Sequence, residues 1–125
     1  LYKLIDEADD PERVTFSEYH AVGADDGDFM VRRGRYKFHY YIKYAPELFD
    51  LESDPAESHD LAADPDYADV VADMEKELRR IVDPEAADAQ AMEDQATLIE
   101  SFGGRDKAMV AGTPGATPVP GYGNE

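Results

Sequence analysis

The stretch RYKFHYYIK, residues 35–43, decides the fold because its side chains alternate in character with a period of two. The apolar positions are Tyr36, Phe38, Tyr40 and Ile42, and lysine, histidine and tyrosine stand between them. Side chains of a β-strand point alternately to opposite faces, so this pattern predicts a strand with one face turned toward a core. We expect Tyr36, Phe38 and Tyr40 to be core residues.

Three further strands are predicted around this one. Residues 13–20, RVTFSEYH, are rich in β-branched and aromatic side chains, and residues 29–33 have a similar character. Gly34 separates residues 29–33 from the alternating stretch, and a short hairpin turn needs a residue of positive φ at such a position. Residues 47–51, ELFDL, fit a short fourth strand. The sequence therefore predicts an antiparallel sheet of three to four strands at about 13–20, 29–33, 35–43 and 47–51.

Helices are predicted in the second half of the chain, after Asp-Pro pairs. Aspartate accepts hydrogen bonds from the free amides of a first helical turn, and proline suits the first helical position because it lacks an amide. Asp64 is expected to cap a helix over residues 65–82, and Asp83 a second helix over residues 84–102 that ends at Gly103-Gly104. The first of these has an apolar stripe at helical spacing. Its members are Tyr67, Val70, Val71, Met74, Leu78 and Ile81.

A further cap is predicted before these helices. Asp54 and Glu57 have the spacing of a capping box, in which Glu57 reaches back to the amide of Asp54 and opens a turn or two of helix. Together the elements predict an α+β fold, with the antiparallel sheet packed against the helix over 65–82. The second helix follows, and an extended tail ends the chain.

The charge of the chain is large and unevenly placed. The 125 residues, enough for one domain, carry a net charge of -17, yet residues 32–43 carry five basic groups and no acid. This basic island, interleaved with aromatic residues, could stack bases and contact phosphates, pair with the acidic helices, or face an acidic surface of another domain. The surrounding acidity argues against nucleic acid and anionic membrane as partners. No apolar run approaches the length of a membrane span.

Catalytic chemistry is largely absent from the sequence. There is no cysteine, and no serine stands in the context of an activated nucleophile. The three histidines are 19 and 20 residues apart, so no local spacing brings two onto one metal. The acidic run Asp25-Asp26-Gly27-Asp28 lacks the loop pattern of a calcium site and is interpreted as a solvated turn. We predict no metal site.

The order of segments resembles a known family. The segments SEYHA, FMVRRGRYKFHYYI and PELFDLESDPAESHDLAADP follow one another as in the C-terminal subdomain of sulfatases of the alkaline phosphatase superfamily. The most specific part is ELFDLESDPAESHDLA, residues 47–62. The similarity covers about residues 13–81 and looks nearest to the bacterial branch of choline sulfatases, arylsulfatases and phosphonate monoester hydrolases.

The resemblance implies a parent hydrolase whose catalytic residues lie elsewhere. The family's nucleophile is a formylglycine made from a Cys/Ser-x-Pro-x-Arg motif, beside a divalent metal of the calcium or magnesium class. The nearest match here, Ser53-Asp54-Pro55-Ala56-Glu57, has glutamate in place of arginine. We therefore expect no catalytic residue and no cofactor in this chain. Formylglycine and metal would belong to a missing N-terminal catalytic domain, which would be the main partner.

The resulting hypothesis is a non-catalytic C-terminal subdomain over residues 13–102. Residues 1–12 would link it to the N-terminal domain, and the Gly/Pro-rich residues 103–125 would be extended or disordered and contact a neighbouring subunit of a homo-oligomer. Glu18 and His20, at the end of the first strand, are the candidates for the rim of the substrate pocket. Alternatives are a free-standing interaction module that uses the basic aromatic sheet face, and a small enzyme in its own right. The branch named above favours the cytoplasm.

Overall fold

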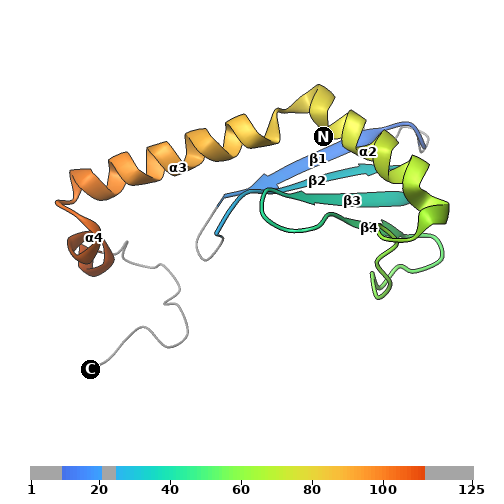
Figure 1. The fold of residues 1–125 in the computed structure, drawn as a ribbon, viewed down its shortest axis with the longest axis horizontal. Coiled ribbons are helices and arrows are strands. Elements are labelled where there is room, and N and C mark those ends of the chain that lie inside the picture. Colours follow the sequence, from blue (N-terminus) through green and yellow to red (C-terminus); the bar gives the residue numbers. More distant parts are fainter. Residues whose placement is uncertain (1–9, 21–24, 112–125) are drawn as a thin grey trace. The chain divides into compact units, whose positions relative to one another are not determined.

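The computed structural model describes residues 10–20 and 25–111, which form an antiparallel sheet followed by helices (Figure 1). The strands are β1 (Val14–Tyr19), β2 (Asp28–Arg33), β3 (Tyr36–Tyr41) and β4 (Glu47–Asp50). The helices are a 3-10 turn η1 (Pro65–Tyr67), α2 (Ala68–Ile81), α3 (Pro84–Ser101) and α4 (Arg105–Ala111). The chain divides into two compact units after Ala89. The predicted α+β fold is confirmed.

The sheet is a four-stranded antiparallel meander in the order β1-β2-β3-β4. Its register follows from the tight turn between β2 and β3, where Arg33 pairs with Tyr36 across Gly34 and Arg35. Gly34 has φ +56°, in the left-handed region that glycine enters without steric cost, as the hairpin prediction requires. The register then places Val31 opposite Phe38, and Phe38 opposite Leu48, on one face.

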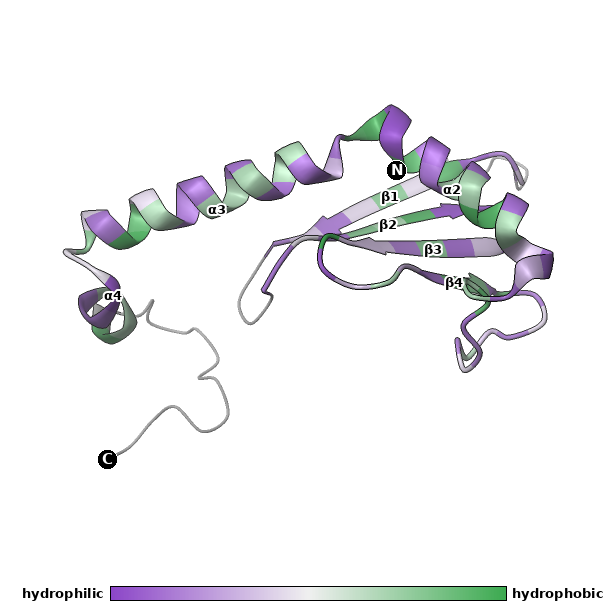
Figure 2. Cartoon of the chain, viewed as in Figure 1, coloured by the Kyte–Doolittle hydropathy of each residue, from purple (hydrophilic) through white to green (hydrophobic). Residues whose placement is uncertain are grey.

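Helix α2 covers this face and closes the core, which lies between the helix and the sheet (Figure 2). The apolar stripe predicted for the helix supplies Met74 and Leu78, both fully buried, while Ile81 remains half exposed. Of the predicted core residues in the sheet, Phe38 is fully buried. Tyr36 and Tyr40 are partly buried and pack against the core. The fully buried core residues are Phe29, Val31, Phe38, Leu48, Met74 and Leu78.

The caps predicted for the two main helices are formed. The Asp64 carboxylate accepts from the Asp66 amide at 2.9 Å and starts η1, which runs directly into α2. The Asp83 carboxylate accepts from the Ala86 amide at 3.1 Å at the start of α3. A cluster around Arg79 joins the two helices to the sheet. Its guanidinium contacts the Glu85 carboxylate at 2.8 Å and lies over the Tyr40 ring at 5.1 Å.

The capping box predicted at Asp54 and Glu57 is not formed, because no helix begins there. Glu57 has φ +54°, which breaks any helical path, and its carboxylate binds the Lys37 ammonium at 2.6 Å. The Asp54 carboxylate instead accepts from the amides of Ser58 and His59 at 2.7 and 2.8 Å. It therefore holds a loop rather than a helix.

This loop leads to a segment that covers the edge of β4. The Leu48 amide donates to the Asp60 carboxylate at 3.0 Å, and the Leu61 amide donates to the Leu48 carbonyl at 2.8 Å. Both backbone groups of Leu48 that point away from β3 are thus satisfied. Pairing of this kind removes the exposed donors and acceptors that otherwise make an edge strand adhesive.

The prediction of an extended tail from residue 103 is wrong for its first part. Gly103 and Gly104, with φ +85° and +106°, end α3 as predicted. Residues 105–111, RDKAMVA, then form the short helix α4, because they contain good helix formers and neither proline nor glycine. The remainder of the predicted tail, residues 112–125, and most of the predicted linker, residues 1–9, lie outside the described residues.

Candidate functional site

The two residues predicted for a pocket rim, Glu18 and His20, lie together at the end of β1. The His20 Nε2 atom is 3.9 Å from the Glu18 carboxylate, and the His20 ring meets the Phe29 ring edge-on at 5.2 Å between centroids. The side chain of His20 is 21% exposed and that of Glu18 is 46% exposed. The imidazole is thus held between a core aromatic ring and a carboxylate, and both polar side chains remain accessible.

The start of β2 is fixed closely beneath His20. The Gly27 amide donates to the Asp88 carboxylate of α3 at 2.7 Å, and the Lys43 amide donates to the Asp26 carboxylate at 2.7 Å. Asp26 and Asp88 are both buried, so these bonds satisfy groups that would otherwise be costly. The acidic run that includes Asp26 therefore serves structure. Within residues 10–20 and 25–111 no group of three or more histidine, aspartate or glutamate side chains is placed to hold a metal ion.

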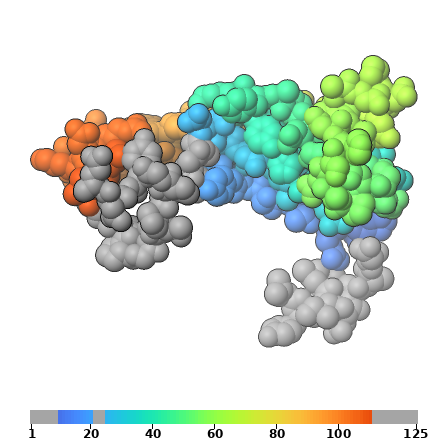
Figure 3. Space-filling view, turned by 90° about the horizontal axis from the view of Figure 1, so that it is seen from below, coloured from blue at the N-terminus to red at the C-terminus, as the bar shows by residue number. Residues whose placement is uncertain are grey.

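The face of the sheet opposite α2 carries polar pairs that sequence reasoning missed. We call it the open face; it is made by Thr15, Ser17 and Tyr19 of β1, by Asp28, Met30 and Arg32 of β2, and by the odd-numbered residues of β3 and β4. Figure 3, which views the side turned away from α2, shows the strand residues, blue to teal, at the surface. The sheet thus has one face in the core and one turned outward.

Two hydrogen-bonded pairs lie on the open face near the ends of β1 and β3. The His39 Nδ1 atom is 3.0 Å from the Asp28 carboxylate, and the Tyr41 hydroxyl donates to the Glu47 carboxylate at 2.8 Å. The His39 and Tyr41 rings stack at 6.0 Å between centroids. Burial, followed by this hydrogen bond to Glu47, raises the pKa of Tyr41, so its hydroxyl stays a proton donor. Extending the β2–β3 pairing outward from the turn at Gly34 would have predicted that Asp28 and His39 lie close together.

The basic island is largely neutralised within the chain, but only Arg33 pairs with an acidic helix, as the second of the three interpretations predicts. Arg33 binds Asp73 of α2 and lies 3.6 Å from Glu77, and Arg35 binds Asp50. The hydrogen bond from Arg35 holds the pKa of the Asp50 carboxyl below its usual range. Beside these pairs, Lys37 pairs with Glu57, and Lys43 donates to the Asp25 carbonyl. Arg32 is exposed on the open face, and no ion pair to it is found among residues 10–20 and 25–111.

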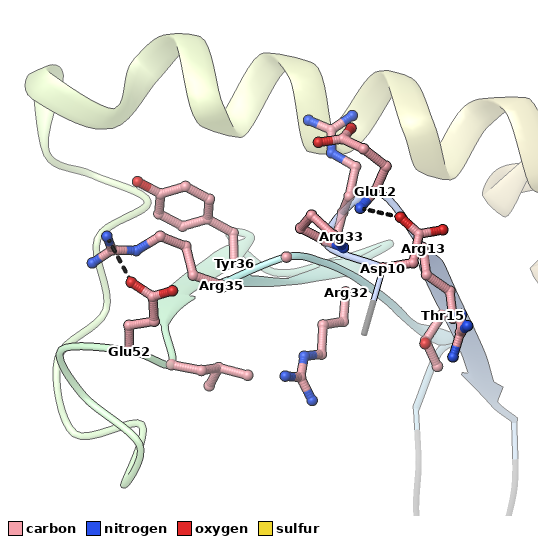
Figure 4. A pocket seen from close by; sticks show the side chains of 12 residues that line it. Asp10, Glu12, Arg13, Thr15, Arg32, Arg33, Arg35, Tyr36 and Glu52 are labelled. Carbon is pink, nitrogen blue, oxygen red and sulfur yellow. Dashed lines mark hydrogen bonds and ion pairs between the residues drawn. The ribbon is translucent and has the colours of Figure 1, made fainter. Parts of the chain in front are cut away.

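A shallow depression surrounds the turn between β2 and β3 (Figure 4). Its lining combines the arginines at positions 13, 32, 33 and 35 with the acids Asp10, Glu12 and Glu52. In Figure 4 Arg33 points toward the helix and Arg32 points to the other side of the sheet. Glu52 forms an ion pair of 3.0 Å with Arg35, so the depression is of mixed charge. It lies at the opposite end of β1 from Glu18 and His20.

A comparison with protein families shows the family to which the chain belongs. The family model described as "N-sulphoglucosamine sulphohydrolase, C-terminal" matches residues 2–83, about two thirds of the chain. The chain belongs to this sulfatase C-terminal family. The match ends at Asp83, the cap of α3, so the shared part contains the whole sheet, the loop that covers β4, and α2.

Curated sulfatases are similar to this sulfatase C-terminal domain over a small part of their own length. Arylsulfatase K of Danio rerio is 39% identical over 74 residues, which are 54% of this chain and 13% of that protein. Arylsulfatase K of Mus musculus is 35% identical over 53% of this chain and 12% of that protein. Delta 4,5-hexuronate-2-O-sulfatase of Bacteroides thetaiotaomicron is 42% identical over 45 residues, 35% of this chain and 9% of that protein. The chain therefore spans about an eighth or less of these relatives.

Solved structures give the same result. A 2-O GAG sulfatase superposes with a TM-score of 0.53 at 26% identity, over 73% of this chain and 19% of that one. A second solved structure, from Bacteroides thetaiotaomicron, has the same TM-score and identity over 74% of this chain. The fold of these solved sulfatases is thus shared by about three quarters of the chain.

The cofactors that sulfatases imply find no fitting residues in the described part of this domain. The chain has no cysteine, and the Ser53 hydroxyl, in the nearest match to the nucleophile motif, donates to the Asp50 carboxylate at 2.8 Å. The neighbouring Asp54 is occupied by two loop amides. Neither a formylglycine nor a metal site is therefore built by these residues. Within residues 10–20 and 25–111, none of the helices combines the length and apolarity that crossing a membrane requires.

Proposed function

We propose that this chain is a non-catalytic domain of a sulfatase-like hydrolase that completes the fold of the parent enzyme. The observation that carries the proposal is the family match over residues 2–83, together with the similarity to proteins named as sulfatases. The absence of cysteine supports the assignment of catalysis to another part of the parent. In the parent, formylglycine and a divalent metal of the calcium or magnesium class would supply the nucleophile and the electrophilic activation.

We further propose that Glu18 and His20 contribute to the rim of the parent's substrate pocket. Both are polar and partly exposed, and the His20 ring is packed against Phe29. A side chain that is already held in place can position a ligand without large entropic loss. Phe29 and the close approach of Gly27 support the His20 ring from below. The pair lies at a strand end, where binding groups commonly gather.

The names of the relatives support a substrate class. One relative is a Delta 4,5-hexuronate-2-O-sulfatase, and one solved structure is a 2-O GAG sulfatase. On that basis we propose that the parent hydrolyses a sulfate ester on an anionic sugar. The narrower choline sulfatase, arylsulfatase and phosphonate monoester hydrolase branch stays a prediction. Sulfate release from a sulfated uronate and from choline sulfate would separate the two.

The rim is tested in the full-length parent with His20→Ala and with His59→Ala as the matched control. The side chain of His59 is 83% exposed and lies in the loop that precedes η1. We expect His20→Ala to lower kcat/KM for sulfate release by about tenfold, the effect of losing one hydrogen bond to a charged group, while His59→Ala has no effect. Equal activity of the two variants across substrates would remove His20 from the rim.

The interaction-module alternative has little support left, because four of the five cations of the basic island bind acceptors within the chain. A titration of the chain with labelled single-stranded oligonucleotides tests it, and salt-sensitive binding would revive it. The small-enzyme alternative is tested by esterase and sulfatase turnover of the chain alone. A homo-oligomer formed through residues 103–125, and a cytoplasmic location, also stay predictions.

A further inference from the structure

We propose that Asp88 of α3 is a positioning residue for the rim pair Glu18 and His20. It holds the start of β2 against the His20 ring and thereby fixes that ring at the end of β1. This inference deepens the proposed function and rests on it, since the rim is part of that proposal. Asp88 lies beyond residues 2–83, so the hold on the rim comes from a helix outside the region that the family model matches.

The sheet register brings Gly27 next to His20. Tyr19 of β1 pairs with Asp28 of β2. The next residues outward on the two chains are His20 and Gly27, which therefore lie side by side. A Cβ on Gly27 would lie 2.9 Å from Cε1 of His20, so the Gly27 backbone packs close against the imidazole. A shift of Gly27 thus changes the space in which the His20 ring sits.

A hydrogen bond ties Gly27 to the helix. The Gly27 amide donates to the Asp88 carboxylate at 2.7 Å, and both residues are buried. Hydrogen bonds to a charged acceptor are among the stronger ones in proteins, and removal of the acceptor leaves a buried amide without a partner. Loss of the Asp88 carboxylate therefore favours a different position of Gly27, in which the amide reaches water.

Asp88 stands on a part of α3 that is itself firmly placed. Pro84, one turn before it, is fully buried, and Ala87 packs against the core. The Asp83 carboxylate caps the start of the helix by accepting from the Ala86 amide at 3.1 Å. Groups carried by well-packed regular elements are held more precisely than groups on loops. The Asp88 carboxylate is therefore a fixed point for the start of β2.

The residue before Gly27 is held from the other side. The Asp26 carboxylate accepts from the Lys43 amide at 2.7 Å, which ties this segment to the chain that follows β3, away from β1. The bond to Asp88 acts instead at Gly27 itself, the residue in contact with His20. Removal of the Asp88 carboxylate should therefore disturb the rim while the pairing of the strands stays in place.

The first test is a double-mutant cycle in the full-length parent, read as sulfate release from a sulfated uronate. We expect Asp88→Ala to lower kcat/KM by about fivefold, less than the loss of about tenfold for His20→Ala, because it acts through that ring. The double variant should be no slower than His20→Ala alone, whereas a merely structural role of Asp88 would add its own loss. Asp94→Ala is the matched control, since Asp94 is exposed on the same helix and accepts from Gln90 at 2.9 Å.

Asp88→Asn keeps the proposal testable if Asp88→Ala does not fold. The side-chain oxygen of asparagine can accept the same hydrogen bond from the Gly27 amide, so kcat/KM should fall by less than about twofold. Thermal unfolding of each variant shows whether the parent is folded at the assay temperature. Equal losses in Asp88→Asn and Asp88→Ala would overturn the hydrogen bond as the source of the effect.

A spectroscopic signal reports the position of His20 without any need for sulfatase activity. The parent is labelled with carbon-13 at Cε1 of histidine, and the His20 signal is identified by its loss in His20→Ala. Cε1 is the ring atom that faces Gly27, and the Phe29 ring lies edge-on to the imidazole at 5.2 Å between centroids, so a displaced ring changes its chemical shift. We expect Asp88→Ala to move this signal and Asp94→Ala to leave it in place. An unmoved signal in Asp88→Ala overturns the positioning role.

The outcomes separate this inference from the proposal on which it rests. Full activity of His20→Ala, with a His20 signal that moves in Asp88→Ala, overturns the pocket rim but supports the hold of Asp88 on His20. A slow His20→Ala enzyme whose double variant is slower still supports the rim and overturns Asp88 as its positioning residue. A moved signal together with a loss that does not add supports both.

Discussion

Gly27→Ala should destabilise the sheet through a clash that the structure locates atom by atom. A Cβ at this position would lie 2.7 Å from Cε2 of the Phe29 ring and 2.9 Å from Cε1 of His20. Carbon atoms attract best at about 3.5–4.0 Å, so both approaches are strongly repulsive. Phe29 is fully buried in the core and has little room to move, whereas His20 is partly exposed and can shift.

The magnitude follows from two opposing effects. Forcing one extra carbon into a packed site costs about 1–3 kcal/mol. Replacing glycine by alanine also restricts the unfolded chain, which stabilises the fold by about 0.4–1 kcal/mol. The clash is the larger effect, so we expect a net loss of about 1–2 kcal/mol in the free energy of unfolding. For a domain of this size, that loss lowers Tm by about 5–15 °C.

The assay is thermal and urea unfolding of the 125-residue chain, followed by circular dichroism. Ser58→Ala is the control, because Ser58 is exposed in the loop before η1. In a Phe29→Leu background, which removes the ring atoms nearest Gly27, the cost of Gly27→Ala should fall. A Gly27→Ala protein whose Tm equals or exceeds that of the wild type, or an equal cost in both backgrounds, would refute the clash.

Three further predictions concern the core, the acid response and the caps. Leu78→Ala, at a fully buried position of α2, should lower the free energy of unfolding by about 2–5 kcal/mol in urea titrations; a loss typical of a surface site would contradict the assigned core. Arg35 lowers the pKa of Asp50, so the ionised Asp50 stabilises the fold at pH values above its unfolded pKa of about 4. This stabilisation is lost as the pH falls further. Asp50→Asn should therefore flatten the dependence of the urea midpoint on pH in that range. An unchanged pH dependence would show that the pair does not form. Asp83→Ala should lower the free energy of unfolding by about 1 kcal/mol, because a helix cap is lost. Glu57→Gln should leave the helical circular dichroism signal unchanged. A loss of helical signal in Glu57→Gln would instead support the predicted capping box.

Local sequence patterns predicted the fold well where the structure that they indicate depends on residues close together in the sequence. The alternation in residues 35–43 identified β3 and its core face, because alternate residues of a strand point to opposite faces of the sheet. Asp64 and Asp83 were recognised as caps since the acceptor and the amides that it binds are neighbours in sequence. The same reasoning failed at Asp54 and Glu57. There Glu57 binds Lys37 of β3, and the chain that follows bonds to the edge of β4. These tertiary contacts outweigh the local helix signal.

The candidate site was only partly predictable for a related reason. Glu18 and His20 share a strand end, so sequence proximity was enough to name them together. The bond between the Gly27 amide and Asp88 joins residues 61 positions apart, and no spacing rule indicates it. The basic island left three interpretations open, because a run of cations has the same sequence whether its partners lie within the chain or outside it. The contacts of Arg33, Arg35 and Lys37 show that most of these cations have partners within the chain.

The segment that bonds to Leu48 makes the two edges of the sheet unequal, because it covers the β4 edge only. On the β4 side, the outward donor and acceptor of Leu48 are already used by Asp60 and Leu61, so a further strand cannot add there without displacing them. On the other side, β1 pairs with β2 alone among the strands of the described residues. A strand supplied by another segment or another molecule would therefore join at β1, and the sheet would extend in that direction only.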